Sequence, residues 1–309
     1  MALTIGQIAA VSYPAVLAEM RKAANQWAES AFMRELERQG AIEHKSLGAT
    51  IEAPLDYQRN PGTVIQTTEL QPLSQTKTEV VTAASYAIAE VTVPVTWSKK
   101  DEATNPSENQ KIALVKQLLE NGIESHDDIL EQSLFLTSTN GFLGLLTHVT
   151  TAGTGSDGGI DSTVNTFWRN QTNTYVDDTD IESAMTTTWN QASKGTGSKL
   201  QPTLIVSDSA TQSLFEGTQQ ALQRYESQDL KAGFKTLMFK TARYVFSQYG
   251  TTTAFFLNPK NFQLVVSKEY FRDRGETQEL QNANGYGFKI YSACQTVTNN
   301  RSRLGNAHL

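Results

Sequence analysis

Apolar residues recur at helical spacing in two stretches of the chain. Between residues 14 and 39 they follow Ser12 and Pro14, a pair typical of a helix start, so we expect an amphipathic helix there. A second stripe follows Asn105 and Pro106, which match a cap residue and a proline at the first helical position. Its apolar positions are Ile112, Val115, Leu119, Ile123, Leu130 and Leu134. They predict a helix of about thirty residues, roughly 45 Å long at 1.5 Å per residue.

Between these two helices the sequence takes on the character of β-strands. Strand-like residues begin near Thr50, and residues 59–62 favour a turn. At residues 91–97 valines alternate with polar positions, and Pro94 falls on the polar side, as expected for an edge strand. We therefore expect one long hairpin over residues 48–97, with residues 91–97 as its return arm. Its first arm is too polar to form a core of its own, so it should lie across another part of an assembly.

The remainder of the chain mixes helices and strands. A glycine-rich, loop-dominated connector is expected at residues 137–171, and strands broken near residues 258–260 and Gly275 are expected over residues 253–297. Between them the pattern predicts helices at 179–192 and 209–224 and strand-like segments at 203–206 and 234–246. This order indicates an α+β protein.

The charges of the long predicted helix oppose its dipole. Lys111 and Lys116 lie toward its amino end, whereas Asp127, Asp128 and Glu131 lie toward its carboxyl end. Each such charge costs about 0.3–1 kcal/mol when it lies in a terminal turn. Our hypothesis is that neighbouring copies of the chain supply compensating partners.

Composition narrows the class of protein. The chain has 309 residues and a formal net charge of -6, which argues against strong nucleic-acid binding by bulk charge. A single cysteine, Cys294, cannot form an intrachain disulfide and favours synthesis in a reducing compartment. Apolar residues (39%) and charged residues (19%) are both below typical usage, which favours a subunit that buries much of its surface against others. No apolar run approaches the roughly 18 residues that a membrane span needs.

Few residues form a motif with catalytic or binding chemistry. Gly153, Gly155 and Gly158 match the spacing of a dinucleotide-binding loop, but residues 160–166 lack the helical stripe that should follow, so a surface loop is favoured. His126 lies on the apolar stripe of the long helix and is interpreted as a packed or interfacial residue.

Two remaining clusters also favour structural roles. The four histidines are too scattered for a metal site. The acidic cluster of Asp177, Asp178, Asp180 and Glu182 could bind calcium. However, Thr179 with Glu182 matches a capping box, which we favour. We predict no catalytic, cofactor-binding or metal-binding residue.

The order of these parts resembles the major capsid protein of tailed bacteriophages, which has the Hong Kong 97 fold. The resemblance spans nearly the whole chain. Residues 158–161 with 167–170 are similar to a segment that follows the long helix in one group of these proteins, and the ending at residues 294–305 is similar too. The resemblance implies five segments along the chain. They are an N-terminal arm with a helix (1–45), an extended loop formed by a β-hairpin (46–97), a peripheral domain with a spine helix and the connector (98–176), an axial domain (177–250) and C-terminal strands returning to both domains (251–309).

The resemblance also implies a function. A structural, non-enzymatic subunit would assemble into hexamers and pentamers of an icosahedral head around double-stranded DNA, without sequence-specific contacts and without a membrane. It would be made in the cytoplasm of a bacterial host and become part of the virion. Scaffolding, portal and decoration proteins are the implied partners, and because only about 45 residues precede the loop, we expect the scaffold to be a separate protein.

Twelve residues are candidates for assembly interfaces. Some relatives cross-link a lysine of the extended loop to a neighbour's asparagine, but nothing around Lys77 indicates that reaction, and we do not predict it. The candidates come from the arm, the loop, the long helix, the connector and a mixed-charge cluster near the end: Trp27, Tyr57, Arg59, Asn60, Lys77, Glu79, Lys111, Lys116, Trp168, Arg169, Arg272 and Arg274.

Three alternatives stay open at this point. An encapsulin-type nanocompartment shell would use the same fold to hold enzymes. A cytosolic nucleotide-dependent enzyme would use the loop at Gly153. Another virion component, such as a tail protein, would form rings or tubes.

Overall fold

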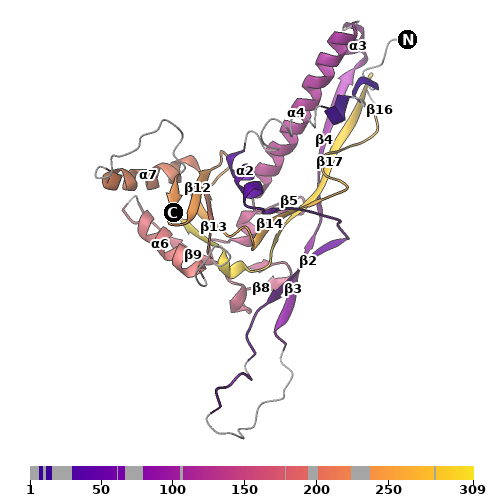
Figure 1. Cartoon of the computed structure of the whole chain (residues 1–309). Coiled ribbons are helices and arrows are strands. Elements are labelled where there is room, and N and C mark those ends of the chain that lie inside the picture. The colour runs from indigo at the N-terminus through magenta and orange to yellow at the C-terminus, as the bar shows by residue number, and fades with distance from the viewer. Residues whose placement is uncertain are drawn as a thin grey trace.

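The computed structural model describes most of the chain (Figure 1). The described residues are 7–9, 12–15, 30–60, 62–66, 79–104, 107–177, 179–193, 201–223, 237–281 and 283–309. Trp27 and Lys77, two of the candidate interface residues, lie outside them, as do Asn105, Pro106 and Asp178.

The arm contains a short helix, α2 (Ala31–Arg38). Ser30 has an extended backbone conformation and caps this helix, because its Oγ accepts a hydrogen bond from the Met33 amide (3.0 Å). Residues 12–15 are also helical, but the extended Ser30 interrupts any continuation into α2. The prediction of one uninterrupted helix over residues 14–39 is therefore wrong.

The long helix is confirmed as α4 (Glu108–Leu134), a helix of 27 residues. Its cap is Ser107, whose Oγ accepts a hydrogen bond from the Gln110 amide (3.3 Å), so the helix begins later than predicted. The expected apolar stripe is buried from Val115 to Leu134, but Ile112 is exposed. A short helix, α3 (Lys99–Thr104), precedes it.

The first sheet lies alongside α4 (Figure 1). Its longest strand is β17 (Gly285–Thr298), which pairs antiparallel with β4 (Ala89–Ser98) and β14 (Phe262–Ser267). The parallel strand β1 (Ile42–Lys45) pairs with β14, and two short strands, β15 (Asp273–Arg274) and β16 (Gln278–Glu279), also pair with β17. Val115, Leu119 and Ile123 of α4 pack against Val95, Trp97, Phe288 and Ile290 of this sheet.

The hairpin is shorter than predicted. Its strands are β2 (Thr50–Asp56) and β3 (Val81–Ala87), and they pair antiparallel from Thr50–Ala87 to Asp56–Val81. The return arm predicted at residues 91–97 is instead part of β4, so that prediction is wrong. Its alternation arises because one face of β4 packs on α4 while its edge pairs with β17. Among the described residues β4 pairs only with β17, which confirms that Pro94 lies on an edge strand.

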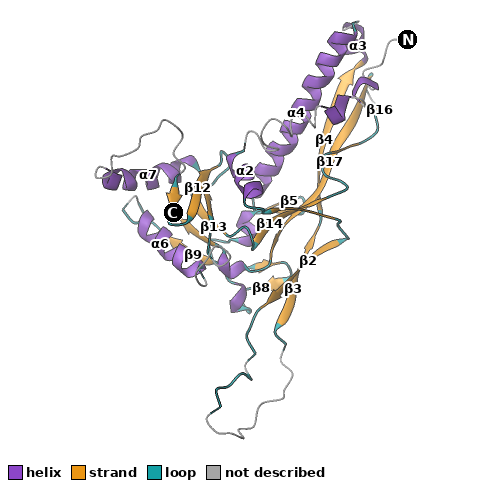
Figure 2. Cartoon of the chain, viewed as in Figure 1, coloured by secondary structure: helices purple, strands orange, loops and turns teal. Residues whose placement is uncertain are grey.

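The second sheet forms a separate layer near the C-terminus (Figure 2). Helices α6 (Ile181–Ala192) and α7 (Ser209–Gln223) pack against it, which confirms the two helices predicted here and the α+β class. Its strands are, in spatial order, β11 (Met238–Phe239), β12 (Ala242–Phe246), β10 (Leu204–Ser207), β13 (Thr253–Leu257), β18 (Gly305–His308) and β9 (Gln171–Thr174).

The capping box predicted for α6 is wrong. Thr179 Oγ1 donates a hydrogen bond to Asp177 Oδ1 (2.6 Å), and its amide donates to the same oxygen (2.9 Å). Thr179 therefore closes a local turn around Asp177. The residue before the helix is Asp180, whose side chain makes no capping hydrogen bond.

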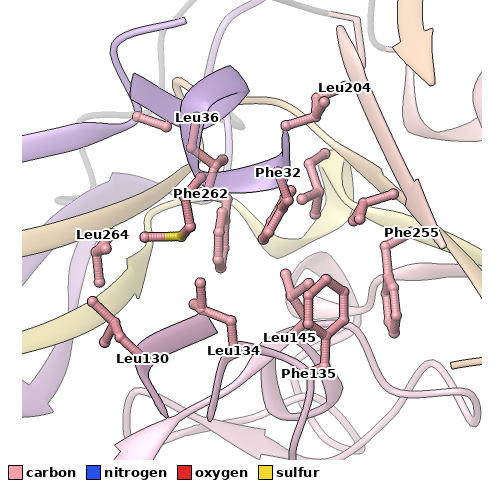
Figure 3. Close-up of a cluster of buried hydrophobic side chains, with 14 of the residues drawn as sticks. Phe32, Leu36, Leu130, Leu134, Phe135, Leu145, Leu204, Phe255, Phe262 and Leu264 are labelled. Carbon is pink, nitrogen blue, oxygen red and sulfur yellow. The ribbon is translucent and has the colours of Figure 1, made fainter. Parts of the chain in front are cut away.

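One apolar core joins α2, α4 and both sheets (Figure 3). Phe32 of α2 and Phe135, just after α4, have ring centroids 5.3 Å apart. Phe262 of β14 comes from the first sheet, and Phe255 of β13 comes from the second. Because both sheets bury side chains in the same cluster, the body that supports the hairpin behaves as one packed unit.

Candidate assembly interface

The hairpin is fastened to the body by its inward face. On each strand alternate residues are buried, as expected for a strand with one covered side. The buried face consists of Ala53, Leu55, Ala84 and Tyr86, which pack against Trp168, Val265 and Val297. This cluster fixes the direction in which the hairpin leaves the body (Figure 1).

The glycine motif of the connector lies directly beneath this hairpin. Two very short strands, β7 (Ser156–Asp157) and β8 (Ile160–Asp161), enclose Gly158 and Gly159, both with positive φ (57° and 78°). A Cβ on Gly158 would lie 2.6 Å from Ala84 Cβ. The Gly158 carbonyl accepts a hydrogen bond from the Ser85 amide (3.0 Å). After β8 the next element is the three-residue 3-10 helix η1 (Thr166–Trp168), so the loop is not followed by the N-terminus of an α-helix. The loop therefore supports the hairpin and lacks the geometry of a dinucleotide-binding turn.

A buried polar network lies below Tyr86. His148, the last residue of α5 (Leu145–His148), places Nδ1 2.9 Å from Asp157 Oδ2 and Nε2 2.8 Å from Thr296 Oγ1. The Tyr86 ring meets the His148 ring edge-on at 5.8 Å. Burial, together with the nearby Asp157 charge, raises the pKa of Tyr86 above its usual value, so its hydroxyl stays neutral and donates to the Thr298 carbonyl (3.0 Å).

Arg301 connects this network to the connector. Its side chain is buried, and its Nε donates to the His148 carbonyl (2.6 Å) while Nη1 donates to the Gly155 carbonyl (3.1 Å). Burial lowers the pKa of Arg301, and the Asp157 charge opposes that shift. Sequence reasoning missed this network because its members lie far apart along the chain and form no local motif.

Beyond the hairpin strands, the loop residues that the structure describes are mostly exposed in the single chain. Tyr57 stacks on Phe167 with ring centroids 4.8 Å apart, and its hydroxyl donates to the Glu79 carbonyl (2.7 Å). Beyond this contact Arg59 and Asn60 are exposed, and Ile65 is 93% exposed. The loop thus has a fixed base and an apolar residue that its own body does not cover.

Two of the candidate interface residues are internal. Trp168 is only 1% exposed, and its Nε1 donates to the Asp157 carbonyl (3.0 Å). Arg272 is 2% exposed, and its guanidinium forms an ion pair with Asp127 (2.5 Å). Both side chains stabilise their own chain, so their expected place on an assembly surface is corrected.

The other candidates on the body remain at or near its surface. Arg169 is exposed and donates to the carbonyls of Ser162 (2.9 Å) and Thr163 (3.1 Å). Arg274 is half-buried, with its guanidinium 4.4 Å from the centre of the Phe288 ring. These contacts order both side chains without covering Arg169.

The acids of the spine helix have partners within the same chain. Asp127 pairs with Arg272, Asp128 accepts the Tyr249 hydroxyl (2.6 Å), and Glu131 accepts the Ser247 hydroxyl (2.6 Å). The hydrogen bond to Asp128 raises the pKa of Tyr249 to about 12. Asp127 therefore has its counter-charge within the chain, and the hypothesis that a neighbouring copy supplies it is wrong. For Asp128 and Glu131, whose partners are neutral hydroxyls, compensation by a neighbouring copy stays a prediction.

The basic residues of the same helix remain near the surface. Lys116 forms an i,i+4 pair with Glu120 (3.7 Å), and Lys111 is half-buried. His126, in contrast, is fully buried on the inner face of the helix, which confirms that it is a packed residue.

Arg272 also connects the N-terminal segment to the first sheet. It has a left-handed backbone (φ 53°), its amide donates to Ser292 Oγ (2.7 Å), and its carbonyl accepts the Tyr13 hydroxyl. A non-glycine residue holds this conformation only where its surroundings determine it. A mixed-charge cluster was the only feature of the sequence that pointed to Arg272, and it did not indicate this role.

Neither a metal centre nor a membrane span emerges from the described ranges. Within them, no group of three or more His, Cys, Asp or Glu side chains could hold a metal ion. Within the same ranges, no helix is both long enough and apolar enough to cross a bilayer.

Comparison by sequence and by structure gives different outcomes. No protein-family model and no curated protein matches the chain by sequence. By structure, the capsid asymmetric unit of cyanophage A-1(L) matches with a TM-score of 0.60 at 13% identity, covering 88% of this chain and 92% of that one. A virus-like particle from Pyrococcus furiosus matches with a TM-score of 0.53 at 9% identity, covering 96% of both chains. The capsid of a native GTA particle matches with a TM-score of 0.54 at 9% identity, covering 88% of this chain and 89% of that one.

Each of these matches covers at least 88% of this chain and at least 89% of the other. At such low identity they establish architecture. The chain therefore has the α+β capsid fold of tailed bacteriophages that the resemblance to the Hong Kong 97 fold predicted.

Proposed function

We propose that this protein is the major capsid protein of a tailed bacteriophage head, a structural subunit without enzymatic activity. Copies would assemble as hexamers and pentamers into an icosahedral shell around double-stranded DNA. The observation that carries the proposal is a body with a capsid fold whose hairpin ends in uncovered residues, with Ile65 93% exposed. An apolar side chain held away from its own core is stabilised when a neighbouring copy covers it.

The five segments of the chain have distinct roles in this proposal. Residues 1–45 would form the arm, residues 46–97 the loop together with most of β4 of the first sheet, residues 98–176 the peripheral domain, residues 177–250 the axial domain, and residues 251–309 the returning strands. Tyr57, Arg59, Asn60 and Glu79 would mediate contacts of the loop, and Lys111, Lys116, Arg169 and Arg274 would mediate contacts of the body. A separate scaffolding protein, a portal and decoration proteins are the proposed partners, and the virion is the proposed location.

A second candidate is a protein compartment that encloses cargo other than a genome. The match to a virus-like particle over 96% of both chains favours it. The nucleotide-dependent enzyme loses its only motif, because the glycine loop packs against the hairpin.

The contents of the particles separate the two candidates. Particles purified from cells that express the chain together with the rest of its viral genome should contain nuclease-resistant double-stranded DNA. Empty particles from expression of the chain alone serve as the matched control. Particles that contain a defined cargo enzyme and no protected DNA would support the compartment and contradict the phage head.

A further inference from the structure

Three cationic side chains line a hollow between the arm helix and the second sheet. The hollow has a volume of about 330 Å³, and Arg38 of α2, Arg243 of β12 and Lys260 of the β13–β14 turn contribute to its wall. The other lining residues are uncharged: Gln39, Thr203, Met238, Thr241, Asn258 and Pro259. The hollow therefore concentrates positive charge in a chain whose formal net charge is -6. We call it the Arg38 hollow.

Glu35 holds the two arginines in place. Arg38 Nε donates to Glu35 Oε2 (2.8 Å), and Arg243 Nη1 donates to the same oxygen (3.0 Å). Although burial acts to raise the pKa of Glu35, hydrogen bonds from Arg38, Gln39 and Arg243 outweigh it and leave that pKa below its usual value. Glu35 thus stays ionised at neutral pH. One carboxylate against three cations leaves two positive charges in excess.

The uncharged part of the wall is also fixed. Thr203 Oγ1 donates to Gln39 Oε1 (2.6 Å), which ties the second sheet to the end of α2. The Lys260 amide donates to Asn258 Oδ1 (3.0 Å), and Asn258 Nδ2 donates to the Gln201 carbonyl (3.0 Å). The turn that carries Lys260 is therefore held before any ligand arrives, which lowers the entropy cost of binding.

The chemistry of the lining selects one class of ligand. Arg38 gives Nε and Nη2 to Glu35, so each guanidinium here offers its remaining N–H groups to a phosphate oxygen, and Lys260 adds a point charge. Recognition of exposed bases uses aromatic side chains as stacking surfaces, and the hollow has none among its lining residues. A phosphate group fits this lining, and contacts to backbone phosphates carry no sequence information.

We propose that the Arg38 hollow binds backbone phosphates of the enclosed double-stranded DNA. This inference rests on the proposed function and adds to it a specific contact surface on each subunit. The α2 face of the body would then point toward the interior of the shell. An acidic peptide segment is the competing ligand, and the experiment distinguishes it.

Salt-dependent binding of a labelled DNA duplex to the full-length chain tests the proposal. Each phosphate contact contributes about 0.9 to the slope of log affinity against log salt concentration. Lys260→Gln should lower this slope by about 0.9 and weaken binding several-fold at low salt, because one contact is lost. Lys268→Gln removes the same charge from an exposed residue outside the hollow and should change neither quantity.

The remaining outcomes overturn the proposal. Equal effects of the two substitutions would show general electrostatic attraction. Dependence on Lys260 for inorganic pyrophosphate alone, with none for the duplex, would assign the hollow to a free phosphate ligand. Tighter, Lys260-dependent binding of a poly-glutamate peptide would assign it to an acidic segment. Electron microscopy of the wild-type chain and of the Lys260→Gln variant distinguishes failure of this inference from failure of the proposed function. Normal shells of the variant with unchanged DNA binding reject only this inference. A wild-type chain that never forms shells rejects the proposed function.

Discussion

Trp168, in the glycine-rich connector, packs against the base of the hairpin. It packs among Leu55, Tyr86 and Val265, and its indole donates to the Asp157 carbonyl (3.0 Å). Residue type alone does not tell whether a tryptophan lies at an interface or in a core, because both environments favour large aromatic side chains. Only the fold shows that the hairpin of the same chain covers Trp168.

Replacing Trp168 should destabilise the subunit. Trp168→Ala removes a buried indole and its hydrogen bond, so we expect a loss of about 3–5 kcal/mol in the free energy of unfolding. Denaturant unfolding of the unassembled chain measures this loss. Val164→Ala in the same connector is the control, because Val164 is largely exposed and should change stability by less than about 0.5 kcal/mol. Similar small effects of both substitutions would contradict the buried position of Trp168.

The only cysteine should be unreactive in the folded chain. Cys294 is buried in β17, and burial raises the pKa of its thiol to about 12. A thiol reagent at pH 8 should modify it only after denaturation. Because the folded pKa lies above the unfolded value of about 8.5, the protonated thiol favours folding below that pH, and this contribution is lost as pH rises toward 12. Rapid modification of the native chain would show that β17 opens easily.

At the scale of elements, the packing of the spine helix on the first sheet depends on Gly122. A Cβ at this position would lie 2.9 Å from Val95 Cγ2 and 3.2 Å from Ile290 Cδ1, whereas a Cβ on Gly217 of α7 meets nothing within 4 Å. Alanine usually stabilises a helix over glycine by about 1 kcal/mol. We expect Gly217→Ala to raise stability by about that amount and Gly122→Ala to lower it by roughly 1 kcal/mol through overpacking. Thermal unfolding of both variants measures the difference, and an equal gain would contradict the close helix–sheet contact.

The pair formed by Asp127 and Arg272 fastens the same helix near its carboxyl end. Asp127→Asn leaves a buried guanidinium without its counter-charge, so we expect a loss of about 3 kcal/mol. Lys116→Ala breaks the exposed pair with Glu120 and should cost at most about 0.5 kcal/mol. Denaturant unfolding compares the two, and similar losses would indicate that Arg272 readily finds another partner.

Elements with a strong local pattern were predictable, and their partners were not. The stripe from Val115 to Leu134 predicted α4 because helical periodicity is local. The alternation at residues 91–97 predicted a strand correctly but assigned it to the wrong neighbour, since a pattern of period two does not specify which strand lies beside it. The polar network around His148 formed no local pattern: His148 contacts residues as far as 153 positions away, and Tyr86 contacts Thr298, 212 positions away.

At the scale of the whole molecule, the described residues form one packed body and a hairpin that projects from it. The core around Phe32 and Phe262 joins the two sheets, so the body has a hydrophobic core of its own. The loop differs, because beyond Tyr57 its described residues leave the body and Ile65 is uncovered. The order of arm, hairpin, spine helix and α+β body was predictable from the sequence, whereas the base of the hairpin packed on its own chain required the structure.

The most direct test of the central claim removes only the projecting part of the loop. Asp56 and Val81 face each other at the end of the hairpin, so a two-residue Asn-Gly turn can replace residues 57–80 without disturbing β2 or β3. Electron microscopy and sedimentation should show closed shells for the full-length chain and a folded, soluble, unassembled subunit for the shortened chain. Normal shells from the shortened chain would contradict the claim that neighbouring copies bind the loop.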